Sequence, residues 1–283
     1  MTLGLLAALC AMSVFGVAAV LQGLATARAD DVAVLDPRLL LRLARQPIFL
    51  LSLTLTLLGF LLHVRALQDL PLFLVQAIIA GSVAVTAVLS VRVFGLRLGR
   101  AQWTAVGLVV LGLALLGPTA APHGSPQAPD GTPLLLLGAV VLVGAAAAGV
   151  RRTPGAAGTV LLGLLAGTGF GVVAVCARLL PDLGLDLLTA PTSWVLVLAG
   201  ATAYLVYSAA MQRGSVTTAT AALVVTQTVV PAVVGLLLGD RIRPGLVPLA
   251  VVGFVLALAG ALSLGRYEGA PPVPAATGAA PTR

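Results

Sequence analysis

The sequence predicts an all-α membrane protein with about nine transmembrane helices, and three observations lead to this prediction. Hydrophobic residues make up 59% of the 283 residues and charged residues only 9%, whereas soluble domains hold about 25% charged residues. The apolar stretches are close to the roughly 20 residues that a helix needs to cross a bilayer. They are continuous rather than alternating, which favours helices over a β-barrel.

The expected spans run over residues 3–27, 47–64, 71–91, 101–118, 132–150, 156–177, 191–211, 215–238 and 244–264. No Lys or Arg precedes the first stretch, so we expect a retained helix and not a signal peptide. All Asp residues and the single Glu lie in connections, at span ends or in the C-terminal tail. An ionised side chain is costly inside a bilayer and is kept there for a task. The sequence therefore predicts a membrane protein without a buried carboxylate.

The charged residues predict an orientation. The net charge is +7, with sixteen Arg and no Lys. With the N-terminus outside, twelve Arg fall on the inner side, and the outer side holds Arg65, Arg178, Arg241 and Arg243. This excess follows the positive-inside rule and predicts a multi-pass cell-membrane protein with its C-terminus in the cytoplasm. Since no basic run alternates with aromatic residues, we expect no nucleic-acid partner.

The chain carries an internal repeat at an offset of 144 residues. This offset aligns Pro47 with Pro191, Phe60 with Tyr204, His63 with Tyr207, Gly95 with Gly239 and Arg97 with Arg241. Upstream, GLLA at Gly4 recurs at Gly163, and FGV follows in both places. A single span separates the two blocks, so the repeats are expected to be inverted in the membrane. Many secondary transporters build a central site between inverted repeats.

The repeat divides the chain into four parts. Residues 1–118 form the first transmembrane repeat and residues 119–131 a Pro-rich linker. Residues 132–266 form the second repeat with one extra helix. Residues 267–283 are expected to be a disordered cytoplasmic tail, and Leu39–Leu43 a short helix at the membrane surface.

Two amides and a proline are the main candidates for contact with a solute. Gln76 and Gln227 each need hydrogen-bonding partners in hydrocarbon. They either face a shared cavity or bond to neighbouring helices. Thr220 and Pro231 belong to the same polar span as Gln227, and Pro231 removes the helical bond to the Gln227 carbonyl. That carbonyl either contacts a solute or belongs to a kink satisfied by nearby hydroxyls.

Two tyrosines share one face of the span 191–211. Tyr204 and Tyr207 are close to one turn apart, and they either line a cavity or belong to an interfacial aromatic belt. His63 and Arg65 are expected at the outer end of their span, with side chains that reach toward water. Gly163, Gly167 and Gly171 form a stripe of small residues, which predicts close helix packing. The spans hold no metal-ligand set, so we expect neither a metal nor a cofactor.

The residues then resemble a known family. Residues 66–117, which begin ALQDLPLFLVQ, and the run TQTVVPAVVGLLLGDRIRPG from Thr226 to Gly245 are similar to the core of the EamA-like drug/metabolite transporter superfamily. Leu74–Gln76 also resembles the NIPA-like branch, usually linked to magnesium. The resemblance implies ten helices in two repeats of five, whereas nine are counted. It also implies an acid in each repeat's turn, which Asp240 supplies in the second repeat and Gly95-Leu96-Arg97 lacks.

These observations predict a secondary transporter that moves a small neutral or weakly polar metabolite by alternating access. The absence of carboxylates from the spans argues against a proton relay and against a Mg²⁺ site. A NIPA-like magnesium transporter and a non-transporting membrane scaffold remain the alternatives. No catalytic set occurs within the spans, so we expect no enzyme. The expected partners are the lipid bilayer and a small solute, and a homodimer is left open.

Overall fold

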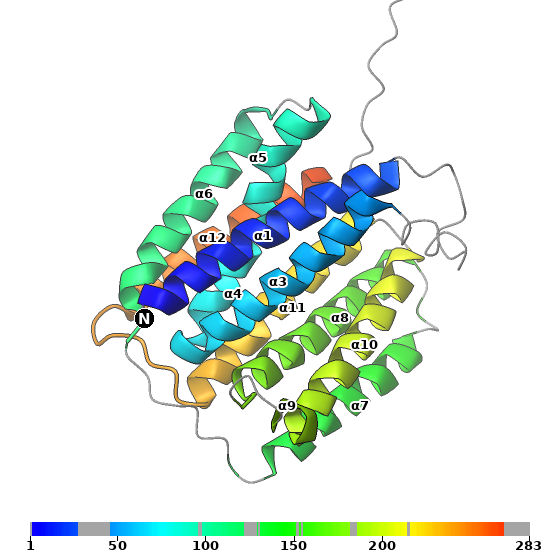
Figure 1. The fold of residues 1–283 in the computed structure, drawn as a ribbon, viewed down its shortest axis with the longest axis vertical. Helices are drawn as coiled ribbons and strands as arrows, with labels where there is room; N and C mark the ends of the chain where they lie inside the picture. The colour runs from blue at the N-terminus through cyan, green and yellow to red at the C-terminus, as the bar shows by residue number, and fades with distance from the viewer. Residues whose placement is uncertain are drawn as a thin grey trace, which may run out of the picture.

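Long helices that run side by side form nearly the whole structure, which is a computed structural model (Figure 1). It describes residues 2–27, 46–95, 98–121, 129, 131–150, 153, 155–181, 186–213 and 216–268. The short helix expected at 39–43, the linker residues 122–128 and 130, and the tail from 269 lie outside these ranges.

The described residues form eleven α-helices. In chain order they are α1 (Thr2–Ala27), α3 (Pro47–Asp69), α4 (Leu72–Ala80), α5 (Ser82–Phe94), α6 (Arg100–Leu116), α7 (Thr132–Val150), α8 (Gly155–Arg178), α9 (Asp186–Thr189), α10 (Pro191–Met211), α11 (Val216–Leu237) and α12 (Val247–Glu268). A single 3₁₀ turn, Gly117–Thr119, follows α6. Within the described ranges nine helical segments are long and apolar enough to cross a membrane, α4 and α5 together forming one of them. The predicted number of spans is therefore confirmed.

Proline and glycine set corresponding helix boundaries in the two halves. Pro47 begins α3 and Pro191 begins α10, where the missing N–H of proline costs no helical bond. Gly95 follows α5 with φ of 67°, and Gly239 follows α11 with φ of 98°. Glycine adopts this left-handed conformation without the steric cost of a Cβ. The residues aligned at the 144-residue offset thus begin and end helices alike.

Two expected spans differ most from the structure. The span expected at 47–64 continues to Asp69, because no helix breaker occurs before Pro71 and Arg65 pairs with Asp69 one turn later. The span expected at 71–91 is divided at Gly81 into α4 and α5. As a result, His63 lies well inside its helix and not at its end.

The helices pack in two groups joined along their centre. In the first group α1 contacts α3 and α5, and in the second α8 contacts α7, α10 and α11. The groups meet where α4 packs on α11 and where α6 packs on α12. In Figure 1, α7, α8 and α10 lie together at the lower right, and α5 and α6 at the upper left.

Glycines allow the closest helix contacts. A Cβ built at Gly163 would lie 2.6 Å from the Ala219 carbonyl oxygen, and one at Gly167 would overlap the Leu223 carbonyl oxygen. Gly171 faces Pro231, whose Cδ would lie 3.1 Å from such a Cβ. All three glycines of the predicted stripe are therefore buried against α11. Small residues let two backbones approach in this way.

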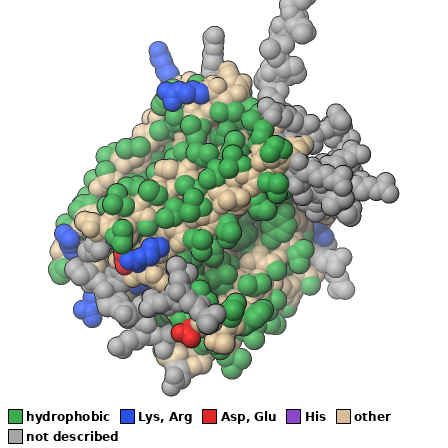
Figure 2. Space-filling model, in the orientation of Figure 1, with side chains coloured by type: hydrophobic (Ala, Val, Ile, Leu, Met, Phe, Trp, Pro, Cys, Tyr) green, Lys and Arg blue, Asp and Glu red, His purple; other side chains and the backbone are tan. Residues whose placement is uncertain are grey.

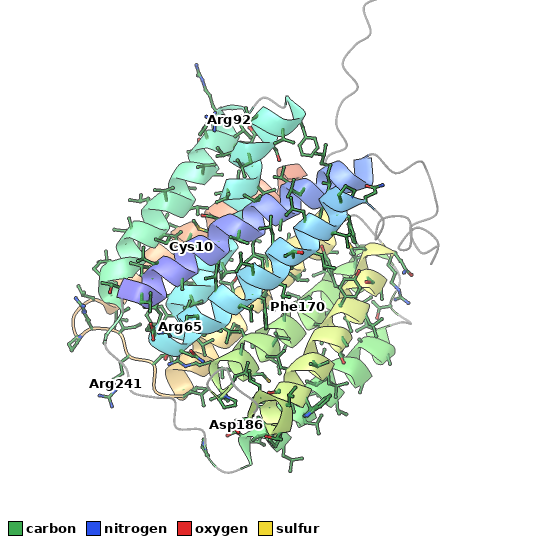
Figure 3. All side chains as sticks on the ribbon, in the orientation of Figure 1. Cys10, Arg65, Arg92, Phe170, Asp186 and Arg241 are labelled. Carbon is green, nitrogen blue, oxygen red and sulfur yellow. The ribbon has the colours of Figure 1, made fainter. Side chains whose placement is uncertain are left out.

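The bundle has two ends that are named here by residues near them. At the Asp240 end α3, α8 and α11 finish and α4 and α12 begin; at the Arg92 end α5 and α10 finish and α6, α8 and α11 begin. Figure 3 shows Arg65, Arg241 and Asp186 toward the first end and Arg92 at the second. Between the ends, exposed Leu and Val side chains cover the surface (Figure 2). Charges at the ends and an apolar band between them fit a bilayer.

Candidate functional site

A polar pair joins α3 to α4 in the interior. Gln76 is 3% exposed, and its Nε2 lies 3.3 Å from His63 Nε2. The amide donates this hydrogen bond when the imidazole is neutral with its proton on Nδ1. Phe15 and Phe60 both meet the His63 ring edge to face, with ring centroids 6.5 Å apart. The expected position of His63 at a span end, reaching toward water, is therefore wrong: its side chain points inward.

A second polar pair joins α10 to α11. The hydroxyls of Tyr207 and Thr220 lie 2.6 Å apart. Both side chains are partly buried, and Tyr207 packs against the apolar cluster that contains Leu162, Ala166 and Leu223. Sequence reasoning proposed both residues for a cavity, and the structure brings them into direct contact.

The two pairs occupy corresponding positions in the chain. The partners are 13 residues apart in each pair. The offset of 144 residues that aligns His63 with Tyr207 also aligns Gln76 with Thr220. Each pair therefore links the same two helices of its half through the same two positions, although the four side chains differ.

The pairs lie toward opposite ends of the bundle. Gln76 is the fifth residue of α4, which begins at the Asp240 end, and Thr220 is the fifth residue of α11, which begins at the Arg92 end. One helical turn spans 3.6 residues. Each pair thus lies about one turn inside its end.

Gln227 lies between these two levels, near the middle of α11. Its side chain is half-buried, and among the described residues no group hydrogen-bonds to its amide. Pro231 has no N–H to donate to the Gln227 backbone carbonyl. By contrast, the neighbouring hydroxyls are used within the bundle, because Thr226 donates to the Leu164 carbonyl at 2.7 Å and Thr228 to that of Val224 at 2.8 Å. The Gln227 amide thus differs from these two hydroxyls in having no hydrogen bond among the described residues.

Tyr204 does not face the interior. It is 63% exposed, and Val197, two turns earlier on the same helical face, is 61% exposed. Tyr204 and Tyr207 are three residues apart, so about 60° separates them around the helix axis. That rotation places Tyr207 against α11 and Tyr204 on the outer apolar surface. The cavity interpretation of Tyr204 does not fit this placement.

A hollow marks the face between the two groups of helices. Figure 2 shows hydrophobic side chains receding there, between α3 and the pair formed by α8 and α10. Phe170 of α8 lies beside it (Figure 3). Among the described residues, the hydrogen bonds between α3 and α8 are found only at the Asp240 end.

That end holds a buried ion pair. Arg178, the last residue of α8, approaches Asp240 with 2.6 Å between Nη2 and Oδ1. The two side chains are 2% and 0% exposed. Asp240 lies in the connection after α11, as the sequence predicts, but the surrounding helices bury it. The expectation that this protein buries no carboxylate is therefore wrong for Asp240.

The ion pair fills the junction between α3 and α4. Arg178 Nη1 donates to the carbonyls of Leu67 and Leu70 at 2.8 and 2.7 Å. The Leu72 backbone N–H donates to Asp240 Oδ2 at 2.6 Å. The cation thus lies at the negative end of one helix dipole and the anion at the positive end of the next. Pro71 cannot donate, so these side chains satisfy backbone groups that the junction would otherwise leave unpaired.

Sequence reasoning missed His63 and the ion pair, although weak signals existed. The repeat aligned His63 with Tyr207, which argued for an interior position. The resemblance put an acid at Asp240, and Arg178 closes its span. Neither signal showed that the two charges meet, because they are 62 residues apart in the chain.

The fold and its surface define an all-helical protein embedded in a membrane, with polar pairs in an apolar interior. Comparisons of this chain with protein-family models, with curated proteins and with solved structures find no match.

Proposed function

We propose that this protein is a secondary transporter of the drug/metabolite type, which carries a small neutral or weakly polar metabolite by alternating access. The observation that carries the proposal is the pair of corresponding hydrogen bonds, His63–Gln76 and Tyr207–Thr220. Many secondary transporters alternate access between two sides of an inverted repeat, and duplicated contacts at opposite ends of a bundle are consistent with that arrangement.

The directions of the helices support an inverted repeat. The contact of Gly235 with Leu72 aligns the end of α11 with the start of α4, so these corresponding helices run antiparallel. Each pair then belongs to one side of the membrane, and Gln227 lies between them. With the orientation that the arginines predict, the Asp240 end faces outward.

The chemistry of the interior supports an uncharged solute. The pairs offer an amide, an imidazole, a phenol and a hydroxyl, which hydrogen-bond to polar neutral groups. Mg²⁺ prefers carboxylate oxygens and retained waters. The carboxylate of Asp240 is already bonded to Arg178 and to the Leu72 N–H. Gln227 supplies an amide at the midplane, where a bound solute is accessible to both gates.

Counterflow in proteoliposomes tests the proposal. The purified protein is reconstituted, and exchange is measured for radiolabelled neutral amino acids, sugars and nucleosides, with Mg²⁺ as a separate arm. We expect exchange of at least one neutral solute. Gln227→Leu should reduce it about fivefold or more, the effect of losing one hydrogen bond of about 1 kcal/mol.

Gln212→Leu is the matched control, since that amide is exposed just after α10, and it should leave exchange unchanged. Exchange of Mg²⁺ alone would replace the proposal with the magnesium alternative. Equal exchange by both variants would show that Gln227 does not contact the solute. No exchange of any solute would favour a non-transporting scaffold.

A further inference from the structure

The Arg178–Asp240 ion pair lies at one end of the bundle, and the two sequence positions that align with it are uncharged. The 144-residue offset aligns Asp240 with Leu96, and the FGV match aligns Arg178 with Gly23. Gly23 packs beside the ring of Phe94 at the end of α5, 3.5 Å from a Cβ built on it. One helix packs near the end of a neighbouring helix at both places, and among the described residues a buried ion pair is found only at the first of them.

This ion pair connects three separate parts of the chain. Arg178 ends α8, Asp240 follows α11, and together they hold the α3–α4 junction through the carbonyls of Leu67 and Leu70 and the N–H of Leu72. The junction belongs to the first group of helices, and both charges belong to the second. The two groups are therefore tied together at the Asp240 end.

Energetic reasoning argues that stability alone does not explain such a pair. Removing two charges from water costs free energy that their attraction repays only with excellent geometry, and apolar residues often do as well. One donor here is not satisfied, because the Arg178 Nε–H is buried and has no acceptor among the described residues. Buried charges are best attested where they select one arrangement over another.

We propose that Arg178 and Asp240 form a latch that closes the Asp240 end, and that the latch separates when this end opens during transport. The inference rests on the proposed transport function and assigns a positioning role to two residues that do not contact the solute. Separation would free the α3–α4 junction from α8 and α11. Among the described residues of the Arg92 end, where Gly23 meets Phe94, no buried ion pair has to separate when that end opens.

The accessibility of one engineered cysteine tests the latch. Ala177 precedes Arg178, is fully buried, and belongs to the apolar cluster that α3 and α4 complete. Ala177→Cys is introduced with Cys10→Ala and Cys176→Ala, and labelling by N-ethylmaleimide is followed without solute. Asp240→Asn should accelerate labelling about tenfold or more, as when an open state rises from on the order of 1% to on the order of 10%.

The native Cys176 provides the matched control. It is fully buried one residue earlier, but it packs in the cluster formed with α7 and α10. In a Cys10→Ala background, Asp240→Asn should leave the labelling rate of Cys176 unchanged. Arg178→Lys gives a second, milder variant if Asp240→Asn fails to accumulate, because Lys keeps the charge but loses the planar set of donors. It should give an intermediate labelling rate at position 177.

Two outcomes would overturn the proposal. Unchanged labelling at position 177 would show that the ion pair does not close this end. Equal acceleration at positions 176 and 177 would show that it holds the whole bundle together. Because labelling is measured without solute, a negative counterflow result would refute the transport proposal and leave the latch to be judged on its own.

Discussion

The helix pairs α3–α4 and α10–α11 place a hydrogen bond at corresponding positions and make it from different side chains. In the first pair an amide meets an imidazole at 3.3 Å, and in the second a phenol meets a hydroxyl at 2.6 Å. Corresponding prolines begin α3 and α10, and corresponding glycines follow α5 and α11. The comparison teaches that the two halves share a geometric frame and differ in the chemistry placed on it.

The ends of the bundle differ more strongly than the halves. A buried ion pair fixes the Asp240 end, and a backbone bridge between Ala120 and Ile242 lies beside it. Gly23 and Phe94 meet at the Arg92 end.

The largest effect should come from one half of the buried ion pair. Asp240→Leu leaves Arg178 charged and enclosed, and we expect a loss of about 3–5 kcal/mol in the free energy of unfolding. Arg65→Met is the control at the same end: the Arg65 and Asp69 side chains are 37% and 23% exposed, so its effect should be about 0–1 kcal/mol. Denaturation by SDS in detergent micelles measures both. If both variants lost the same free energy of unfolding, Asp240 would not be buried away from water.

Helix packing gives the next effect. Gly167→Ala forces a Cβ against the Leu223 carbonyl of α11, and overpacking of this kind costs about 1–3 kcal/mol. Gly138→Ala on α7 has no neighbour within 4 Å of the new methyl group and should stabilise the helix by up to about 1 kcal/mol. Thermal denaturation in detergent measures the difference. A stable Gly167→Ala variant would show that α8 and α11 are further apart than described.

The two tyrosines of α10 offer a smaller and sharper contrast. Tyr207→Phe removes the bond to Thr220, and we expect a loss of about 0.6 kcal/mol, the average for such bonds between membrane helices. Tyr204→Phe should have no measurable effect, since its ring lies on the outer surface. Both are followed by unfolding in the same micelles. If Tyr204→Phe lost solute exchange and Tyr207→Phe did not, the interpretation that Tyr204 lines a cavity would be supported after all.

Grafting one pair onto the other half should change stability least. His63→Tyr with Gln76→Thr reproduces the second pair at the corresponding positions. If the frame is shared, the grafted side chains re-form a hydrogen bond of about 1 kcal/mol, so the double variant should lose little free energy of unfolding. Gln76→Thr alone should be less stable than the double variant. In counterflow, we expect the double variant to exchange a different set of neutral solutes. If it exchanges the same solutes as the native protein, the two pairs stabilise the fold and do not select the solute.

Much of the fold could be predicted from residues close together in the chain. Hydropathy located the helices, and proline and glycine located corresponding boundaries, because each of these effects acts within a few residues. The repeat aligned His63 with Tyr207 before any contact was known. The end of α3 was placed five residues short, at 64 instead of Asp69, because the polar residues His63 and Arg65 resemble the edge of a membrane span when they are read alone.

The candidate site could be predicted only in part. Gln76, Tyr207, Thr220 and Gln227 were chosen because polar groups in hydrocarbon need partners. Their partners depend on which helices are neighbours and how each helix is rotated. Tyr204 was chosen by the same argument and lies outside, since three residues of rotation separate it from Tyr207.

By itself the sequence determined an all-helical membrane protein, nine apolar spans and a register that aligns its two halves, because hydropathy and backbone chemistry are local properties. The tertiary structure decided which polar groups meet. From the sequence, a charged residue in a connection is predicted to be exposed to solvent. Asp240 is buried instead, because α3, α4, α8 and α11 together enclose it. Burial depends on all the elements that cover a group, so no single segment could reveal the ion pair.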